Sequence, residues 1–219
     1  MSWFEDWFDS PYYHILYENR DEHEAENFIR KLLISLNISK GAKVLDAACG
    51  KGRHSRTLAN LGFDVTGIDL SANSIAFAKK FESNNLRFSV HDIRTNYAQE
   101  TFDYVFNLFS SFGYCEEDTE DYKVMHAFAT DLKREGILVL DYINTEFAVK
   151  NMKPRQIIQR GEIQFHIQKR LEKGFIKKKI DFLAKGENYS FEEQLKVINL
   201  FKFDKMLTEA GLQLIKTFG

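Results

Sequence analysis

Residues 44–54 read VLDAACGKGRH, and this stretch decides the fold of the chain. A short apolar strand runs into a tight glycine turn, and a helix is predicted to begin directly after that turn. Gly50 and Gly52 let the backbone come close to a ligand, because neither residue carries a Cβ. In doubly wound folds such a turn lies at the carboxyl end of the sheet, where nucleosides bind.

Helical and strand patterns alternate along residues 21–144. Helices are predicted, from apolar residues at helical spacing and from their caps, over residues 21–36, about 55–61, 71–81 and 117–132. Strands are predicted over residues 44–48, 63–68, 86–90, 102–108 and 137–142. These strands are nearly continuous apolar runs, which is typical of a parallel sheet covered on both faces. We therefore predict an α/β fold with a doubly wound, mostly parallel sheet.

The pattern changes after Asn144. Between residues 150 and 198 apolar and polar residues alternate, and glycines mark the turns. This alternation predicts an antiparallel β insertion after the fifth strand, serving as a substrate cover or a dimer contact, within one domain of residues 1–219. We interpret the lysine run at 177–179 as a solvated face of that insertion. A helix at 201–210 and a sixth strand at 212–218 are expected to return to the main sheet. The sequence does not decide whether a seventh strand is missing after Gly219 or the sheet edge is completed otherwise.

Composition excludes several classes of protein. The 219 residues carry a formal net charge of -2, which is not the basic excess of a nucleic-acid binder. No apolar run approaches the roughly 18 residues that span a bilayer. The two cysteines, Cys49 and Cys115, are too few and too far apart for a disulfide framework or a zinc site. We expect a cytoplasmic protein without a metal, a nucleic-acid partner or a membrane contact.

The residues around the glycine turn discriminate between its ligands. A phosphate-binding loop needs Ser or Thr after Gly-Lys, and Ser55 stands where a dinucleotide site needs a third glycine. Asp46 suits a ligand with an ammonium group, as in S-adenosylmethionine, better than a pyrophosphate. Asp69, at the tip of the second strand, can accept both hydroxyls of an adenosine ribose. After the third strand, Asp92 is positioned to accept a hydrogen bond from the adenine amino group, and Ile93 is positioned to pack against the adenine ring.

With these motifs the chain resembles the class I S-adenosylmethionine-dependent methyltransferases of the small-molecule branch. The matching motifs are DAACGKG at 46–52, GIDLS at 67–71, HDI at 91–93 and FDYVF at 102–106. The resemblance covers residues 21–144 and 201–218. It implies S-adenosylmethionine as the cofactor, S-adenosylhomocysteine as the product and a small molecule as the methyl acceptor.

The resemblance also implies which residues bind the cofactor. From the methionine end through ribose and adenine to the acceptor side they are Asp46, Ala47, Gly50, Asp69, Leu70, Asp92, Ile93, Asn107 and Phe109. Family members often bring an N-terminal tyrosine to the cofactor, so Tyr13 and Tyr17 are added. They belong to an aromatic segment, residues 1–20, that we interpret as a lid over the site or as a strap on the sheet edge.

Methyl transfer is an in-line displacement at the sulfonium carbon, so the protein mainly aligns the acceptor and excludes water. A general base is needed only when the attacking atom is protonated. Tyr114, Tyr142 and His14 are the candidates for orienting or deprotonating an acceptor, and no catalytic residue is assigned. The motif Asn107-Leu108-Phe109-Ser110 differs from the Asn/Asp-Pro-Pro-aromatic motif of amide and adenine methyltransferases.

Two other functions remain open from the sequence. One is a cofactor-binding regulatory or partner subunit without catalysis of its own. The other is a nicotinamide dehydrogenase, which Asp46 and Ser55 disfavour. A homodimer is also left open, and so are the acceptor and the atom that receives the methyl group.

Overall fold

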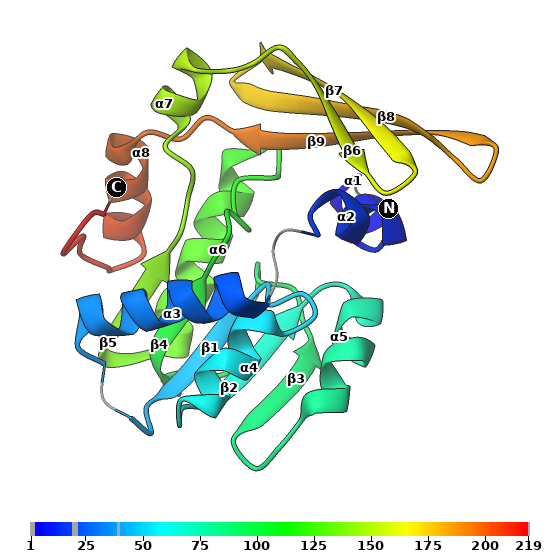
Figure 1. Ribbon diagram of the computed structural model, residues 1–219. Helices are drawn as coiled ribbons and strands as arrows, with labels where there is room; N and C mark the ends of the chain where they lie inside the picture. The colour runs from blue at the N-terminus through cyan, green and yellow to red at the C-terminus, as the bar shows by residue number, and fades with distance from the viewer. Residues whose placement is uncertain (1–2, 19–21, 39, 219) are drawn as a thin grey trace.

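The computed structural model describes residues 3–18, 22–38 and 40–218 of the chain. A parallel sheet with its helices forms one half of the molecule, and an antiparallel sheet lies above the carboxyl ends of its strands (Figure 1). None of the helices in these ranges is long and apolar enough to cross a membrane.

The first sheet is the predicted doubly wound sheet, and the α/β fold is confirmed. It has the strand order β3-β2-β1-β4-β5, and its neighbouring strands all pair in parallel. Its strands are β1 Lys43–Ala47, β2 Asp64–Asp69, β3 Leu86–Val90, β4 Phe102–Asn107 and β5 Leu132–Leu140. The order reverses at β1, so the crevice for a ligand opens where β1 and β4 end.

Helices cover both faces of this sheet, which is why its strands are apolar throughout. One face is covered by α3 Glu22–Leu36, α4 Arg53–Asn60 and α5 Ala72–Ala78, the last of which continues as the 3-10 turn η1 Lys79–Phe81. The other face is covered by α6 Asp118–Asp131 and α8 Leu200–Glu209. Val44 and Leu45 are adjacent in β1 and both are fully buried, one in each core.

The predicted insertion is a four-stranded antiparallel meander in the order β6-β7-β8-β9. Its strands are β6 Arg155–Arg160, β7 Ile163–Glu172, β8 Phe175–Ala184 and β9 Glu187–Lys196. A helix that the sequence did not predict, α7 Thr145–Lys150, connects it to β5, and the Asn144 side chain caps that helix by accepting the Phe147 N–H at 3.0 Å.

The N-terminal segment, residues 3–18, forms two short helices on the antiparallel sheet. These are α1 Trp3–Phe8 and α2 Pro11–Leu16, which lie below that sheet on the side of the parallel one (Figure 1). Trp7, Tyr12 and Leu16 are buried in a core that they share with β7 and β8. The segment therefore packs on the face of the antiparallel sheet instead of on a sheet edge.

The sixth strand predicted at 212–218 was wrong, because these residues form no regular element. Helix α8 ends in a C-terminal cap in which Gly211 adopts a φ of +80° and the Leu212 N–H bonds the Leu207 carbonyl at 2.8 Å. This cap turns the chain back against its own helix. Ile215 and Phe218 remain 78% and 58% exposed, which is incompatible with a place in the sheet.

Candidate cofactor and acceptor site

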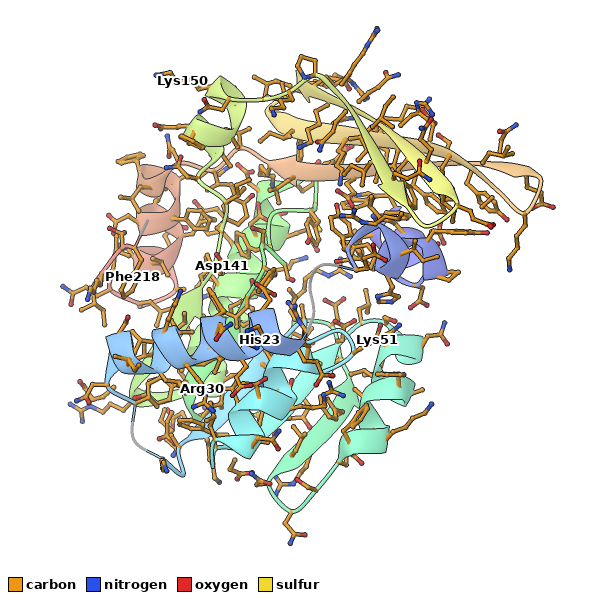
Figure 2. All side chains as sticks on the ribbon, in the orientation of Figure 1. His23, Arg30, Lys51, Asp141, Lys150 and Phe218 are labelled. Carbon is orange, nitrogen blue, oxygen red and sulfur yellow. The ribbon has the colours of Figure 1, made fainter. Side chains whose placement is uncertain are left out.

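A cavity of about 1270 Å³ lies between the parallel sheet and the antiparallel sheet. Asp46 and the segments 48–51, 69–71 and 91–94 form its floor at the carboxyl ends of β1 to β3. Figure 2 shows Lys51 and Asp141 on the side of the parallel sheet that faces the cavity. The residues of the antiparallel sheet that line the cavity form its roof; they are Gln156, Lys169, Ile176, Lys178, Glu193, Gln194 and Leu195.

The glycine turn at the end of β1 leaves room for a ligand. Gly50 has a φ of +56°, and a Cβ built on it would meet no atom within 4 Å. Its backbone therefore borders open cavity space. Gly52 serves packing instead, because a Cβ there would lie 2.5 Å from the ring of Phe88.

Asp46 is a buried carboxylate beside this turn. Its side chain is 2% exposed, and the Ser55 hydroxyl donates to it at 2.5 Å. Burial raises the pKa of Asp46 to about 6, although the Ser55 hydrogen bond opposes the shift. A cation placed next to Asp46 would favour its ionised form. Ser55, where a dinucleotide site needs glycine, thus has a role of its own.

Asp69 closes the turn from the neighbouring strand. One oxygen accepts the Gly50 N–H and the other accepts the Ser71 N–H, both at 2.8 Å. Burial raises the pKa of Asp69, against the effect of these two bonds. Each carboxylate oxygen keeps a second acceptor position, so Asp69 can bind ligand hydroxyls while holding the turn. Leu70 follows it on the floor and is 37% exposed.

Asp92 and Ile93 line the floor after β3, but Asp92 is already engaged. Arg94 donates to both oxygens of Asp92 from Nε, at 3.0 and 2.9 Å, and bonds Glu120 from Nη1 at 3.0 Å. Burial alone would raise the pKa of Asp92, and the hydrogen bonds and charge of Arg94 outweigh it and lower that pKa. The sequence analysis did not identify Arg94, because its partner Glu120 lies 26 residues further along the chain and outside any local motif.

Two predicted binding residues do not line the cavity. Asn107 is fully buried, and its amide donates to the carbonyl of Ala47 at 3.0 Å. Ala47 is fully buried as well. Both residues therefore lie behind the cavity wall, where Asn107 ties the end of β4 to the end of β1.

Phe109 does line the cavity, in a strained loop after β4. Phe109 and Ser110 have φ of +61° and +56°, a conformation that costs about 1–3 kcal/mol per residue outside glycine. Asp141 holds this loop, because its side chain accepts the Phe109 N–H and its carbonyl accepts the Ser110 N–H, both at 2.9 Å. The Phe109 ring stacks on His54 at 4.9 Å between centroids. The strained loop therefore lies beside the part of the cavity where the methyl acceptor is expected to bind.

The N-terminal segment brings Tyr13, His14 and Tyr17 to the cavity. Burial and the charge of Lys51 lower the pKa of His14, although Asp9 raises it. The Tyr17 hydroxyl donates to Glu193 in the roof at 2.7 Å. Of the sequence-predicted candidates, these three therefore meet the floor residues in one cavity.

The two remaining candidates differ in position. Tyr114 lines the cavity, and its ring contacts the rings of Trp3, Phe4 and Phe8 in the N-terminal segment. Tyr142 does not line it, and its hydroxyl donates to the carbonyl of Lys196 at 2.6 Å. Burial raises the pKa of Tyr142 above its usual range, so its hydroxyl stays protonated at neutral pH.

The residues present fit S-adenosylmethionine on this structure's own geometry. The open space at Gly50 accommodates a ligand against the backbone, and the same turn adds two carboxylates, the buried Asp46 and the partly buried Asp69. A ligand with an ammonium group and ribose hydroxyls matches that set of acceptors.

Comparisons with known proteins identify the family of the chain. A family model described as a methyltransferase domain matches residues 38–211. A glycine/sarcosine N-methyltransferase of Parasynechococcus marenigrum (strain WH8102) is 30% identical over 212 residues, which cover 91% of this chain and 72% of that protein. Another, of Aphanothece halophytica, is 38% identical over 131 residues, and the matched part spans 57% of this chain and about half (48%) of that relative's length.

Solved structures show the same fold. A S-adenosylmethionine-dependent methyltransferase of Clostridium acetobutylicum superposes with a TM-score of 0.73 at 21% identity, covering 91% of this chain and 84% of that one. CalS10, an amino pentose methyltransferase of Micromonospora echinaspora solved with S-adenosylmethionine bound, gives a TM-score of 0.73 at 21% identity, covering 92% and 89%.

Proposed function

The chain belongs to the class I S-adenosylmethionine-dependent methyltransferases acting on small molecules, and from this premise we propose that its acceptor is an amine. The observation that carries the proposal is the histidine of the N-terminal segment, His14, which lines the same cavity as the cofactor floor and has a pKa lowered by burial and by the charge of Lys51. Several relatives are N-methyltransferases, of glycine and sarcosine in two cases and of an amino sugar in another, which supports the same acceptor atom.

The floor would hold the cofactor. Asp46 would face its ammonium group, and the open backbone at Gly50 would border its methionine part. Asp69 would accept the ribose hydroxyls, and Ile93 would lie against the adenine. S-adenosylmethionine supplies a methyl group on a sulfonium, a leaving group that needs no further activation.

The acceptor would occupy the part of the cavity between floor and roof. In-line attack requires its nitrogen on the side of the methyl carbon away from sulfur, about 3–3.5 Å from that carbon. Bound S-adenosylmethionine would supply the methyl group, and sulfur would keep the electron pair of the broken C–S bond as the acceptor nitrogen takes the methyl group. Aromatic residues of the N-terminal segment and Tyr114 line this space together with the roof, which supports a role of the antiparallel sheet and the segment as a substrate cover.

An amine is protonated at neutral pH and cannot attack until it loses a proton. Because burial and Lys51 lower the pKa of His14, its imidazole is neutral at pH 7 and has one unprotonated ring nitrogen that can accept that proton. The proton would pass from the ammonium to this nitrogen and then to solvent. An alcohol acceptor would need a much stronger base.

The test compares amines with matched alcohols in a methyl-transfer assay with labelled S-adenosylmethionine. We expect transfer to amines only, with a rate that falls when pH drops below the lowered pKa of His14. His14→Gln should remove that pH dependence, and His23→Gln, on the exposed face of α3, should not. Transfer to an alcohol, or an unchanged pH profile in His14→Gln, would contradict the proposal.

Cofactor binding is tested separately by calorimetry. Asp69→Asn should weaken the binding of S-adenosylmethionine at least about tenfold, because a charged hydrogen-bond acceptor is lost. Asp64→Asn is the matched control, since Asp64 begins the same strand and only bonds Arg87 at the surface. Equal affinities of the two variants would refute the ribose role of Asp69.

A further inference from the structure

Two lysines of the roof face each other across neighbouring strands. Lys169 in β7 lies directly opposite Lys178 in β8, and both line the cavity. Side chains alternate between the faces of a strand, so residues two apart share a face. Ile167 and Ile180, two positions away in each strand, are buried under the N-terminal segment and confirm which face this is.

Like charges directly opposite each other in a sheet destabilise it unless an anion lies between them. Glu193, opposite Lys178 in β9, supplies one negative charge at 3.1 Å. That carboxylate is also shared with Trp7 Nε1, at 2.6 Å, and with the Tyr17 hydroxyl. In the described part of the chain Lys169 has no ion pair of its own, whereas Lys178 pairs with Glu193 and also donates to the Tyr17 hydroxyl.

Further polar groups adjoin this corner of the cavity. Lys153 and Gln156 line it beside the roof lysines. The Lys169 N–H donates to the Pro154 carbonyl at 2.9 Å, which fixes the loop that carries Lys153 next to the strand. Lys153 therefore adds a third ammonium group to the same rim.

The glycine turn of the floor has the opposite charge, because Asp46 and Asp69 line it; elsewhere on the floor Asp92 is paired with Arg94, and Lys51 adds a positive charge. A small ligand with one positive and one negative end is therefore oriented across the cavity. Its cationic end is favoured near the floor, and its anionic end is favoured at the roof.

We propose that the roof binds an anionic group of the methyl acceptor, a carboxylate or a phosphate, with Lys169 and Lys178 as its ligands. The proposal rests on the proposed function, because it takes this cavity as the acceptor site. It makes the substrate an amine that carries a carboxylate or a phosphate at its other end. Ammonium groups bind both anions through charge-assisted hydrogen bonds.

The first test measures anion binding without turnover. The protein loaded with S-adenosylhomocysteine is titrated with inorganic phosphate and, separately, with acetate, at constant ionic strength and with NMR detection. Lys169→Gln should weaken the binding of the preferred anion by about tenfold, because one charge-assisted hydrogen bond is lost. Lys169→Arg should recover most of the lost affinity. Lys179→Gln is the matched control, because Lys179 lies on the other face of β8 and pairs with Asp181.

Each outcome of this titration decides the matter. A loss in Lys169→Gln that is absent in Lys179→Gln supports the roof site, and the stronger of the two anions identifies the group. No binding of either anion, or an equal loss in both variants, overturns it.

The second test separates this inference from the proposed function. Methyl transfer is compared for β-alanine against 3-aminopropanol and for phosphoethanolamine against ethanolamine. Preference for the anionic member of a pair, lost in Lys169→Gln, supports both proposals. Equal transfer to both members overturns the anion site but keeps the amine acceptor. Binding of an anion at the roof without transfer to any amine overturns the amine acceptor but keeps the anion site.

Discussion

Glu193→Gln should loosen the N-terminal segment from the antiparallel sheet. Glu193 accepts hydrogen bonds from Trp7 and Tyr17 and pairs with Lys178, and its side chain is partly buried beside the segment. A hydrogen bond to a charged group contributes about 1.5–3 kcal/mol, and one to a neutral group about 0.5–1.5 kcal/mol. Glutamine keeps one carbonyl acceptor but presents an amide to the remaining donors.

The expected loss in the free energy of unfolding is therefore about 2 kcal/mol, discounted for the partial exposure of the Lys178 pair. With a urea slope of about 2 kcal/mol/M, the midpoint should fall by about 1 M. Tryptophan fluorescence is the assay, because the chain's only two tryptophans, Trp3 and Trp7, both lie in α1. Far-UV circular dichroism follows the remaining structure in the same samples.

Glu192→Gln is the matched control. Glu192 is adjacent in β9 and pairs with Arg170 and Lys177 in exposed ion pairs, which contribute about 0–1 kcal/mol. The fluorescence midpoint of Glu193→Gln should lie well below that of Glu192→Gln. Equal midpoints in the two variants would refute the role of Glu193 as the anchor of the N-terminal segment.

Three further predictions concern single positions. Gly67→Ala should destabilise the protein by about 1–3 kcal/mol in urea unfolding, since its Cβ would lie 2.6 Å from the Phe88 ring; an unchanged midpoint would contradict that packing. Asp46 has a pKa of about 6 in the folded protein, so it binds a proton more tightly there than in the unfolded chain. Ionisation of Asp46 therefore lowers the free energy of unfolding as pH rises from about 4 to 6. In thermal unfolding at pH 7, Asp46→Asn should be more stable than wild type by roughly 2 kcal/mol. Calorimetry should find that wild type loses affinity for S-adenosylmethionine below pH 6, whereas Asp46→Asn binds weakly at every pH.

The floor of the site was predictable because its residues lie within short motifs at strand ends. Asp46, Gly50 and Asp69 needed only the alternation of strands and helices to be placed together. Asn107 was misplaced because a strand-end residue can point to either side of the sheet, and its burial depends on neighbours from two other segments.

The roof was not predictable in the same way. The lysine run at 177–179 was interpreted as a solvated face, but Lys178 faces the cavity while Lys177 and Lys179 face away. The alternation of side chains along a strand determines which residues share a face of the sheet. Which of the two faces is covered depends on the N-terminal segment, more than 140 residues away in the chain. The strand expected at 212–218 failed because its apolar pattern was weighed without the cap at Gly211.

The bond between Trp7 and Glu193 joins residues that are 186 positions apart in the chain. During synthesis on the ribosome, the N-terminal segment emerges before the parallel sheet, but the strands it packs against are translated after that sheet is complete. Residues 22–140 hold the whole parallel sheet and can associate in the meantime, since domains generally fold as units while the chain grows. The aromatic side chains of the N-terminal segment therefore remain exposed to solvent until these strands are made. A nascent chain stalled before β9 would leave them accessible to chaperones and prone to aggregation.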